Sequence, residues 1–417
     1  MSHKSSDMTW PTVHLRHGEA QRIQAGHPWV YSRNIQKVTQ EPEDGDVVQV
    51  RDHRRRFLGL GFFNSKSKIR VRLISRSKLE VNQSFFEMKL QTALNWRHKH
   101  LADRACFRLV NAESDGLSGL IVDNYDGVLV VQTSSLGMDQ RLPQIVGALK
   151  KLMSPKRILE RNDSTGRRME GLEERHSILY QRESENSDTE MIVKMNGLDW
   201  RIDTKKGHKT AAYLDQYENY QQVANLVARM DAPKVLDCFS FMGGFALHSA
   251  KAGATEVTAI DQSEDALDAA TSNAQLNGLS QRCEWVHGNV FDWLKVMTAK
   301  KDNEEALEDG PRYDLIILDP PSFTRSRASV PDALRGYKEI HLRAMRLLKP
   351  DGVMATFCCS HHIDPLTFEG TVLSAAFDNR CTLRRVETYG QPADHPIVPS
   401  IPETEYLKGF AYQRLEY

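Results

Sequence analysis

A thiol and a carboxylate follow two apolar runs of the sequence, and their chemistry is complementary. Cys359 comes shortly after the run at residues 352–355, and Asp319 closes the run at residues 315–318. If both runs are strands of one parallel sheet, both residues lie at the edge where such sheets bind ligands. A thiolate that adds to C6 of a cytosine makes C5 reactive toward an electrophilic methyl group, and an acid can hold the base and exchange a proton. The pair therefore indicates covalent catalysis on a pyrimidine ring.

Three more polar residues end apolar runs earlier in the chain and form a series with Asp319. Asp237 lies in the first of these runs, Asp261 closes the second, and Asn289 follows the third. A carboxylate after the second strand can bind both hydroxyls of an adenosine ribose, and an amide after the third can bond to an adenine edge. Helix capping explains any one acid more readily, but it explains the whole series poorly. The order is the one expected of a class I methyltransferase that binds S-adenosylmethionine.

The loop after the first strand, residues 239–243, contains small residues that allow the backbone to approach a ligand. It lacks the Gly-x-Gly-x-x-Gly pattern of dinucleotide sites, so the loop alone is a weak signal. We predict that the cofactor is bound by Gln216, Phe239, Ser240, Gly243, Asp261, Gln262, Asn289, Val290 and Asp319.

Two adjacent cysteines compete for the role of the nucleophile. Free cysteines are usually buried like small apolar residues, and strand alternation sends Cys358 and Cys359 to opposite faces. The polar residues that follow favour Cys359 as the thiol at the site. Cys238, beside the cofactor loop, is better explained as a core residue. His361 and His362 lack a matching ligand set, so we predict no metal.

Basic residues gather at the start of the chain, although its 417 residues carry no net charge. Residues 1–100 contain 18 Lys or Arg and 9 Asp or Glu, so the remainder contains 55 − 18 = 37 basic and 55 − 9 = 46 acidic residues. A basic module indicates a polyanionic partner such as nucleic acid, and a solvated charged face explains the pattern about equally well. No apolar stretch reaches the ~20 residues that span a bilayer. The six cysteines show neither a disulfide framework nor zinc spacing, so we predict a cytoplasmic protein.

Three domains are expected to position these residues. Residues 1–80 are typical of short strands and turns, and residues 68–74 alternate basic with aliphatic side chains. This pattern predicts a small β-barrel with a basic outer face. Residues 81–190 mix helices with strands and form a central α+β domain. Strands alternate with helices over residues 191–417, which predicts an α/β fold with a Rossmann-like parallel sheet.

These motifs resemble those of the RlmI family of ribosomal RNA methyltransferases over nearly the whole chain. Residues 26–32, Gly-His-Pro-Trp-Val-Tyr-Ser, resemble the start of that family's PUA domain, an RNA-binding barrel. Residues 335–340, Arg-Gly-Tyr-Lys-Glu-Ile, and residues 406–410, Tyr-Leu-Lys-Gly-Phe, are similar to later motifs of the family. The resemblance implies a PUA-like domain, a central domain and a C-terminal class I methyltransferase domain.

The resemblance also implies S-adenosylmethionine as cofactor and large-subunit ribosomal RNA as partner, in which members of the family form 5-methylcytidine. Cys359 would be the nucleophile and Asp319 would hold the base. Ser322 stands where other cytosine-C5 enzymes have a second cysteine, and RlmI-like proteins likewise have a residue other than cysteine there. Asn289 stands where a carboxylate is often found. The predicted RNA-contacting residues are Pro320, Phe323, Lys338, Arg70 and Arg72.

Two other functions compete with this interpretation. Residues 319–323, Asp-Pro-Pro-Ser-Phe, also resemble a motif of RlmK-type guanine-N7 methyltransferases, which need no nucleophilic thiol. Those enzymes tend to have two asparagines where this chain has Cys358 and Cys359, and the N-terminal barrel also points away from them. The second alternative is a non-catalytic RNA-binding factor of ribosome assembly that keeps the fold. The sequence does not decide between a monomer and a homodimer.

Overall fold

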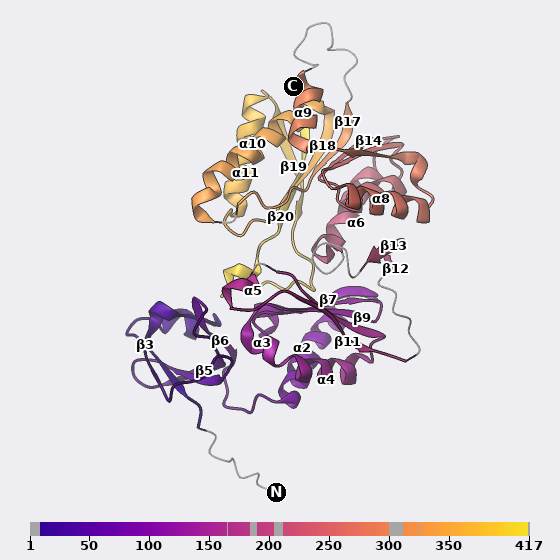
Figure 1. Cartoon of the computed structure of the whole chain (residues 1–417). Helices are drawn as coiled ribbons and strands as arrows, with labels where there is room; N and C mark the ends of the chain where they lie inside the picture. Colours follow the sequence, from indigo (N-terminus) through magenta and orange to yellow (C-terminus); the bar gives the residue numbers. More distant parts are fainter. Residues whose placement is uncertain are drawn as a thin grey trace. The chain divides into compact units, whose positions relative to one another are not determined.

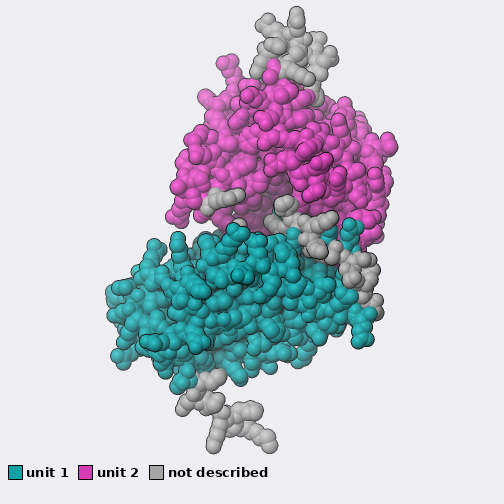
Figure 2. All heavy atoms as spheres, viewed as in Figure 1, with its two compact units in different colours: residues 1–190, 203–214, 393–405 teal, residues 191–202, 215–392, 406–417 magenta. Residues whose placement is uncertain are grey.

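The computed structural model describes residues 9–164, 166–183, 190–203, 212–299, 312–324 and 326–415. The chain divides into two compact units (Figure 2). Unit 1 comprises residues 1–190, 203–214 and 393–405, and unit 2 comprises residues 191–202, 215–392 and 406–417. Each unit is therefore built from segments that are distant in the sequence.

The N-terminal part of unit 1 is a six-stranded sheet in the order β2-β6-β5-β4-β1-β3, accompanied by the short helix α1 (Gln21–Gln24). Apolar side chains of alternate strand positions, such as Val13, Val48 and Val71, pack into one core. At Gly61 a Cβ atom would lie 2.5 Å from the carbonyl oxygen of Arg72, so only glycine permits the close pairing of β5 with β6. The strands are β1 (Thr12–Leu15), β2 (Trp29–Tyr31), β3 (Ile35–Thr39), β4 (Val47–Arg51), β5 (Phe57–Phe63) and β6 (Ile69–Ser75).

The second part of unit 1 is a five-stranded sheet in the order β11-β10-β9-β8-β7, whose core includes apolar residues of helices α2 (Gln83–His100) and α4 (Leu142–Met153). Its core also includes Phe62 and Ile74 from the first sheet, so the two sheets share packing within unit 1. The boundary near residue 80 stays a prediction. The remaining elements are β7 (Cys106–Asn111), β8 (Leu120–Tyr125), β9 (Val128–Thr133), α3 (Leu136–Gln140), β10 (Arg157–Asn162), α5 (Gly166–Met169) and β11 (Arg175–Gln181).

Unit 2 is built on a seven-stranded sheet in the order β16-β15-β14-β17-β18-β20-β19. The first five strands of that order are parallel, and β20 runs antiparallel to both of its neighbours. The strand order reverses between β14 and β17, which is where open α/β sheets bind ligands. The strands are β14 (Lys234–Cys238), β15 (Glu256–Asp261), β16 (Cys283–His287), β17 (Tyr313–Leu318), β18 (Leu348–Cys358), β19 (Thr382–Tyr389) and β20 (Lys408–Leu415).

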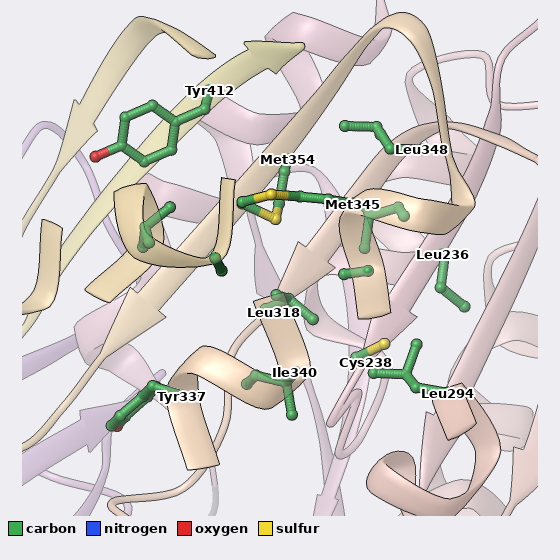
Figure 3. Close-up of a cluster of buried hydrophobic side chains, with 14 of the residues drawn as sticks. Leu236, Cys238, Leu294, Leu318, Tyr337, Ile340, Met345, Leu348, Met354 and Tyr412 are labelled. Carbon is green, nitrogen blue, oxygen red and sulfur yellow. The ribbon is translucent and has the colours of Figure 1, made fainter. Parts of the chain in front are cut away.

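Helices cover both faces of this sheet (Figure 1). Residues of α6 and α7 pack in one core, and residues of α9, α10 and α11 pack in another. Cys238 lies in the second core beside Leu294 and Ile340 (Figure 3), as its interpretation as a core residue predicts. The helices are α6 (Tyr217–Val227), α7 (Gly244–Lys251), α8 (Glu264–Leu276), α9 (Val290–Ala299), α10 (Val330–Leu347) and α11 (Pro365–Asp378), and a hairpin of β12 (Glu190–Met195) and β13 (Leu198–Asp203) precedes them.

Candidate active site

Three carboxylates of the predicted series gather at the point where the strand order reverses. Asp237 is fully buried at the end of β14, and its Oδ2 accepts a hydrogen bond of 2.9 Å from the backbone N–H of Ala246 in α7. Burial raises the pKa of Asp237 well above its usual range, and the negative charges of Asp319 and Asp261 raise it further. The parallel strands thus bring together acids that are up to 82 residues apart in the sequence (319 − 237 = 82).

The loop between β14 and α7 is held in an uncommon backbone conformation. Phe239 has a φ of 65° and Phe241 a φ of 50°, in the left-handed region that large side chains rarely adopt. Asp261 holds this loop, because its Oδ2 accepts a 2.9 Å hydrogen bond from the N–H of Phe241. Its Oδ1 accepts another of 2.9 Å from the N–H of Ser263, at the start of α8. One carboxylate therefore fixes two loops of the site.

Buried polar atoms without partners lie in and beside this loop. A Cβ atom at Gly243, where φ is 81°, would lie 2.7 Å from the ring of Trp285, so the position requires glycine. Among the described residues, the buried Oδ1 of Asp237 and the buried hydroxyl of Ser240 have no hydrogen-bond partner. Buried polar atoms without partners are uncommon in native structures. They indicate a ligand that supplies the missing bonds.

Three other predicted cofactor residues, Asn289, Val290 and Gln262, follow the ends of β15 and β16, and the fourth, Gln216, directly precedes α6. The Oδ1 of Asn289 accepts from the N–H of Phe291 at 2.9 Å, so this residue caps α9 and only its amide nitrogen remains for an adenine edge. Val290 is 3% exposed and belongs to the core, which leaves its backbone rather than its side chain for a ligand. Gln216 is buried, and its Oε1 accepts from Asn219 at 2.6 Å. Gln262 offers its carbonyl oxygen to His287 at 3.1 Å.

These residues fit S-adenosylmethionine. The cofactor carries positive charge on its sulfur and its ammonium group, and the cluster of Asp237, Asp261 and Asp319 compensates such charge. Its ribose and adenine offer hydrogen-bond donors and acceptors to loops whose geometry is already set by Asp261. When bound, the cofactor supplies an electrophilic methyl group.

The two adjacent cysteines differ in their surroundings. Cys358, the last residue of β18, is fully buried in the core beside Tyr337. The pKa of the Tyr337 hydroxyl is raised, mainly by burial and to a lesser extent by electrostatic interaction with Cys358. Cys359 is partly exposed, and its Sγ lies 3.9 Å from the carbonyl oxygen of Pro320. In the same two loops, the hydroxyls of Ser322 and Ser360 are 2.7 Å apart. The thiol of Cys359 therefore lies against the segment that Asp319 opens.

A buried lysine clamps the turn that follows the thiol. Lys408 of β20 pairs with Cys358 of β18 and is 7% exposed. Its Nζ donates hydrogen bonds of 2.7 Å to the carbonyl oxygens of Ser360 and Ile363. The sequence interpretation assigned Lys408 only to a family motif. The sequence does contain a signal for this role. In Tyr-Leu-Lys-Gly-Phe, a charged residue stands at the start of an otherwise apolar run.

The residues predicted to contact RNA are differently placed. Pro320 is buried, and Lys338 is paired with Asp378 at 2.8 Å. Phe323 packs in an aromatic cluster, with its ring centroid 4.6 Å from that of Tyr337. These surroundings are unfavourable to a direct contact by the side chain of Pro320.

The two arginines of β6 do not form an open basic face. Arg72 is 13% exposed and lies 2.9 Å from a carboxylate oxygen of Glu170 and 3.5 Å from one of Glu113. Arg70 donates a 3.1 Å hydrogen bond to the carbonyl oxygen of Asn64. The charge of Arg72 is compensated inside unit 1, so its surroundings are unfavourable to a phosphate contact.

A different group of cations lies near the surface of unit 1, where Lys37 and Arg55 are exposed and Arg51 is half-buried. Lys37, Arg51 and Arg55 lie near His14, and burial together with these three positive charges lowers the pKa of His14. We call these four residues the basic cluster. Nearby in the sequence, a hollow of about 230 Å³ is lined by residues that include Arg22, Trp29, Tyr31 and Arg33. Periodicity had pointed to β6 and missed both features.

Among the described residues, no three His, Cys, Asp or Glu side chains are placed to hold a metal ion. Within the same part of the chain, no helix is long and apolar enough to cross a membrane.

Two protein families match the chain in the places where these features lie. A PUA-like domain matches residues 13–76, and the S-adenosylmethionine-dependent methyltransferase family matches residues 115–408. Ribosomal RNA large subunit methyltransferase I of Vibrio parahaemolyticus is 36% identical over 404 residues, which cover 96% of this chain and 98% of the relative. The chain belongs to this methyltransferase I family. The protein of the same name from Aeromonas salmonicida is 37% identical over 401 residues, covering 95% of this chain and 98% of the relative.

Solved structures agree with this membership at the level of the fold. A putative S-adenosylmethionine-dependent methyltransferase from Streptococcus mutans has a TM-score of 0.79 at 20% identity, covering 96% of this chain and 99% of that one. A putative methyltransferase complexed with SAH has a TM-score of 0.80 at 19% identity, with the same coverage. The predicted α/β methyltransferase fold behind a PUA-like domain is confirmed, and so is the dependence on S-adenosylmethionine.

Proposed function

We propose that this methyltransferase I family member methylates C5 of a cytosine in large-subunit ribosomal RNA, with Cys359 as the nucleophile. The observation that supports this most directly is the 3.9 Å separation between the Sγ of Cys359 and the carbonyl oxygen of Pro320, next to Asp319. Attack on C6 requires a thiol close to the loop whose carboxylate, that of Asp319, binds the pyrimidine. The RNA substrate is inferred from the names of the relatives.

The chain's own residues account for the steps on the base. The thiolate of Cys359 forms a bond to C6 of the cytosine, and the displaced electron pair makes C5 the nucleophile that accepts the methyl group. A base then removes the proton from C5, and the electron pair of that C–H bond reforms the C5–C6 double bond as the S–C6 bond breaks. The thiolate is thereby regenerated. Asp319 holds the N3/N4 edge of the base and keeps the ring in reach of the thiol.

Lys408 supports this chemistry as a positioning residue. Its two hydrogen bonds of 2.7 Å fix the turn of Ser360 and Ile363, directly after Cys359. Cys358 points into the core and serves packing.

The RNA is held by unit 1 in this proposal. The basic cluster offers Lys37, Arg51 and Arg55 to phosphates, and charge of this kind provides most of the affinity for nucleic acids. The hollow near β2 adds Trp29 and Tyr31, whose rings can stack on unpaired bases. The three-domain division and the cytoplasmic location stay predictions, and so do the RNA contacts of Pro320, Phe323, Lys338, Arg70 and Arg72.

One experiment separates this function from its rivals. The purified protein is incubated with ribosomal RNA and methyl-labelled cofactor, and the digested RNA is analysed by mass spectrometry. We expect 5-methylcytidine. Formation of 7-methylguanosine would assign the chain to the guanine-N7 activity, and cofactor binding without any methylated nucleoside would favour a non-catalytic assembly factor.

A further inference from the structure

The loops that carry the acid and the thiol leave two neighbouring strands of the sheet. The parallel pairing of β17 with β18 ends at Leu318 and Thr356, so it does not extend to the acid or to the thiol. Past this last pair, the hydroxyls of Ser322 and Ser360 meet at 2.7 Å. We call this contact the hydroxyl bridge. The position of one loop relative to the other therefore depends on contacts between side chains such as this one.

The hydroxyl bridge has a defined direction. A serine hydroxyl carries a single proton, and that of Ser322 donates to the carbonyl oxygen of Thr324 at 2.8 Å. The hydroxyl of Ser360 is therefore the donor across the bridge. Ser360 is 1% exposed, so a break in the bridge would take this partner from a buried donor. Such a loss is costly, and the bond is therefore expected to persist in solution.

Both ends of the hydroxyl bridge are held by the surrounding fold. On the side of the thiol, the carbonyl oxygen of Ser360 accepts the 2.7 Å hydrogen bond from the Nζ of Lys408. On the side of the acid, the hydroxyl of Thr324 lies 2.7 Å from that of Ser329, which directly precedes α10. The bridge thus joins two anchored segments of unit 2.

We propose that Ser322 is a positioning residue for methyl transfer, which acts through Ser360 to hold the thiol of Cys359 at the loop of the acid. The Sγ of Cys359 lies 3.9 Å from the carbonyl oxygen of Pro320, and the bridge joins the same two loops one residue farther along on the side of the thiol. This inference rests on the proposed function, in which the thiol attacks a cytosine held by Asp319. Such attack requires alignment, and a misplacement of about 1 Å can lower a rate ~100-fold.

A matched pair of variants at the exposed end of the bridge tests the proposal. Threonine and valine have nearly the same shape, and only threonine keeps the hydroxyl. The full-length protein is mixed with RNA that carries 5-fluorocytidine at the target, which traps the thiol adduct. Adduct formation should slow at least ~10-fold in Ser322→Val and stay within about threefold of the wild type in Ser322→Thr. The Kd for RNA and the affinity for the cofactor should be the same in both variants.

A direct hydrogen bond to RNA is the competing role for Ser322, because this residue is exposed. A double-mutant cycle with Ser360→Ala separates the two roles. If the two hydroxyls act through one bond, the double variant Ser322→Val with Ser360→Ala should form the adduct no more slowly than the slower single variant. Losses that add, a loss confined to RNA affinity, or equal adduct rates in Ser322→Val and Ser322→Thr would overturn the proposal.

Alkylation of Cys359 distinguishes a failure of the hydroxyl bridge from a failure of the proposed function. Iodoacetamide reacts with this thiol without RNA or cofactor, and fragment mass spectrometry identifies the modified cysteine. The rate should rise severalfold in Ser322→Val and not in Ser322→Thr, because the released turn no longer keeps the sulfur against Pro320. A wild type that forms no adduct would refute the covalent reaction, while this difference in alkylation would still show that the bridge holds the thiol. Equal alkylation of the two variants would refute the bridge, whatever the reaction.

Discussion

Replacing the two adjacent cysteines one at a time separates chemistry from packing. Cys359→Ser should lower kcat by a factor on the order of 10⁶, or about 8 kcal/mol of barrier, as expected when a covalent nucleophile is lost. Cys358 is fully buried beside Tyr337, so Cys358→Ser places a hydroxyl in the core. That change should cost about 1–2 kcal/mol of stability, or a few degrees in the Tm of a unit this size. Its kcat should stay within about threefold of the wild type.

The assay combines methyl transfer to ribosomal RNA with a trap for the covalent intermediate. RNA that carries 5-fluorocytidine at the target should form a stable adduct with the wild type and with Cys358→Ser, because fluorine does not leave as a proton does. Cys359→Ser should form no adduct while binding the cofactor normally, as measured by calorimetry. Full activity in Cys359→Ser would refute the covalent mechanism. Loss of activity only in Cys358→Ser would reassign the nucleophile.

Four further outcomes are expected. Asp261→Ala should weaken cofactor binding by ~1–3 kcal/mol, measured by calorimetry. The unrelated surface change Val296→Glu serves as the control. Unchanged affinity in Asp261→Ala would remove Asp261 from the site. Asp237 has a pKa raised above 3.8, so its ionisation opposes folding: the destabilisation is absent below the unfolded pKa and grows as pH rises through the folded pKa. Asp237→Asn should therefore raise the Tm of the cofactor-free protein at pH 7, by an amount that shrinks toward pH 4, and an equal gain at both pH values would contradict the reasoning. Lys408→Met removes both 2.7 Å hydrogen bonds that hold the turn after Cys359, so it should lower kcat for methyl transfer while cofactor affinity, measured by calorimetry, stays unchanged. An unchanged kcat would show that Lys408 does not position the thiol. The double change Lys37→Glu and Arg51→Glu should weaken RNA binding and lower its dependence on salt, and binding equal to the wild type in filter assays would exclude the basic cluster.

The ends of the strands could be predicted from the sequence, because a buried strand appears as a run of apolar residues and neighbouring residues of a strand face opposite sides. Apolar runs that stop at a polar residue located the ends of β14, β15 and β17, and parallel pairing then required Asp237, Asp261 and Asp319 to meet. Period-two alternation likewise predicted that only one of the two cysteines could face the site. In the structure Cys358 is buried and Cys359 is partly exposed.

Contacts between side chains that are far apart in the sequence could not be predicted in this way. Arg72 alternates like an outward-facing residue, but its partner Glu170 follows it by 98 positions, and only the fold brings them together. Lys408 reaches the turn after Cys359 through the antiparallel pairing of β18 with β20. In α11 apolar residues occupy both faces, so sequence periodicity could not tell the exposed face from the buried one.

The arrangement around Asp237 relates stability to cofactor binding. Without a ligand, unit 2 keeps mutually repelling carboxylates close together, a buried hydroxyl at Ser240 without a partner among the described residues, and Phe239 and Phe241 in the left-handed region. Each of these features opposes folding. A cationic ligand that completes the hydrogen bonds removes part of that penalty, so the free energy of binding also stabilises the fold. The acids that oppose folding at this sheet edge are therefore those that favour a positively charged ligand over a neutral one.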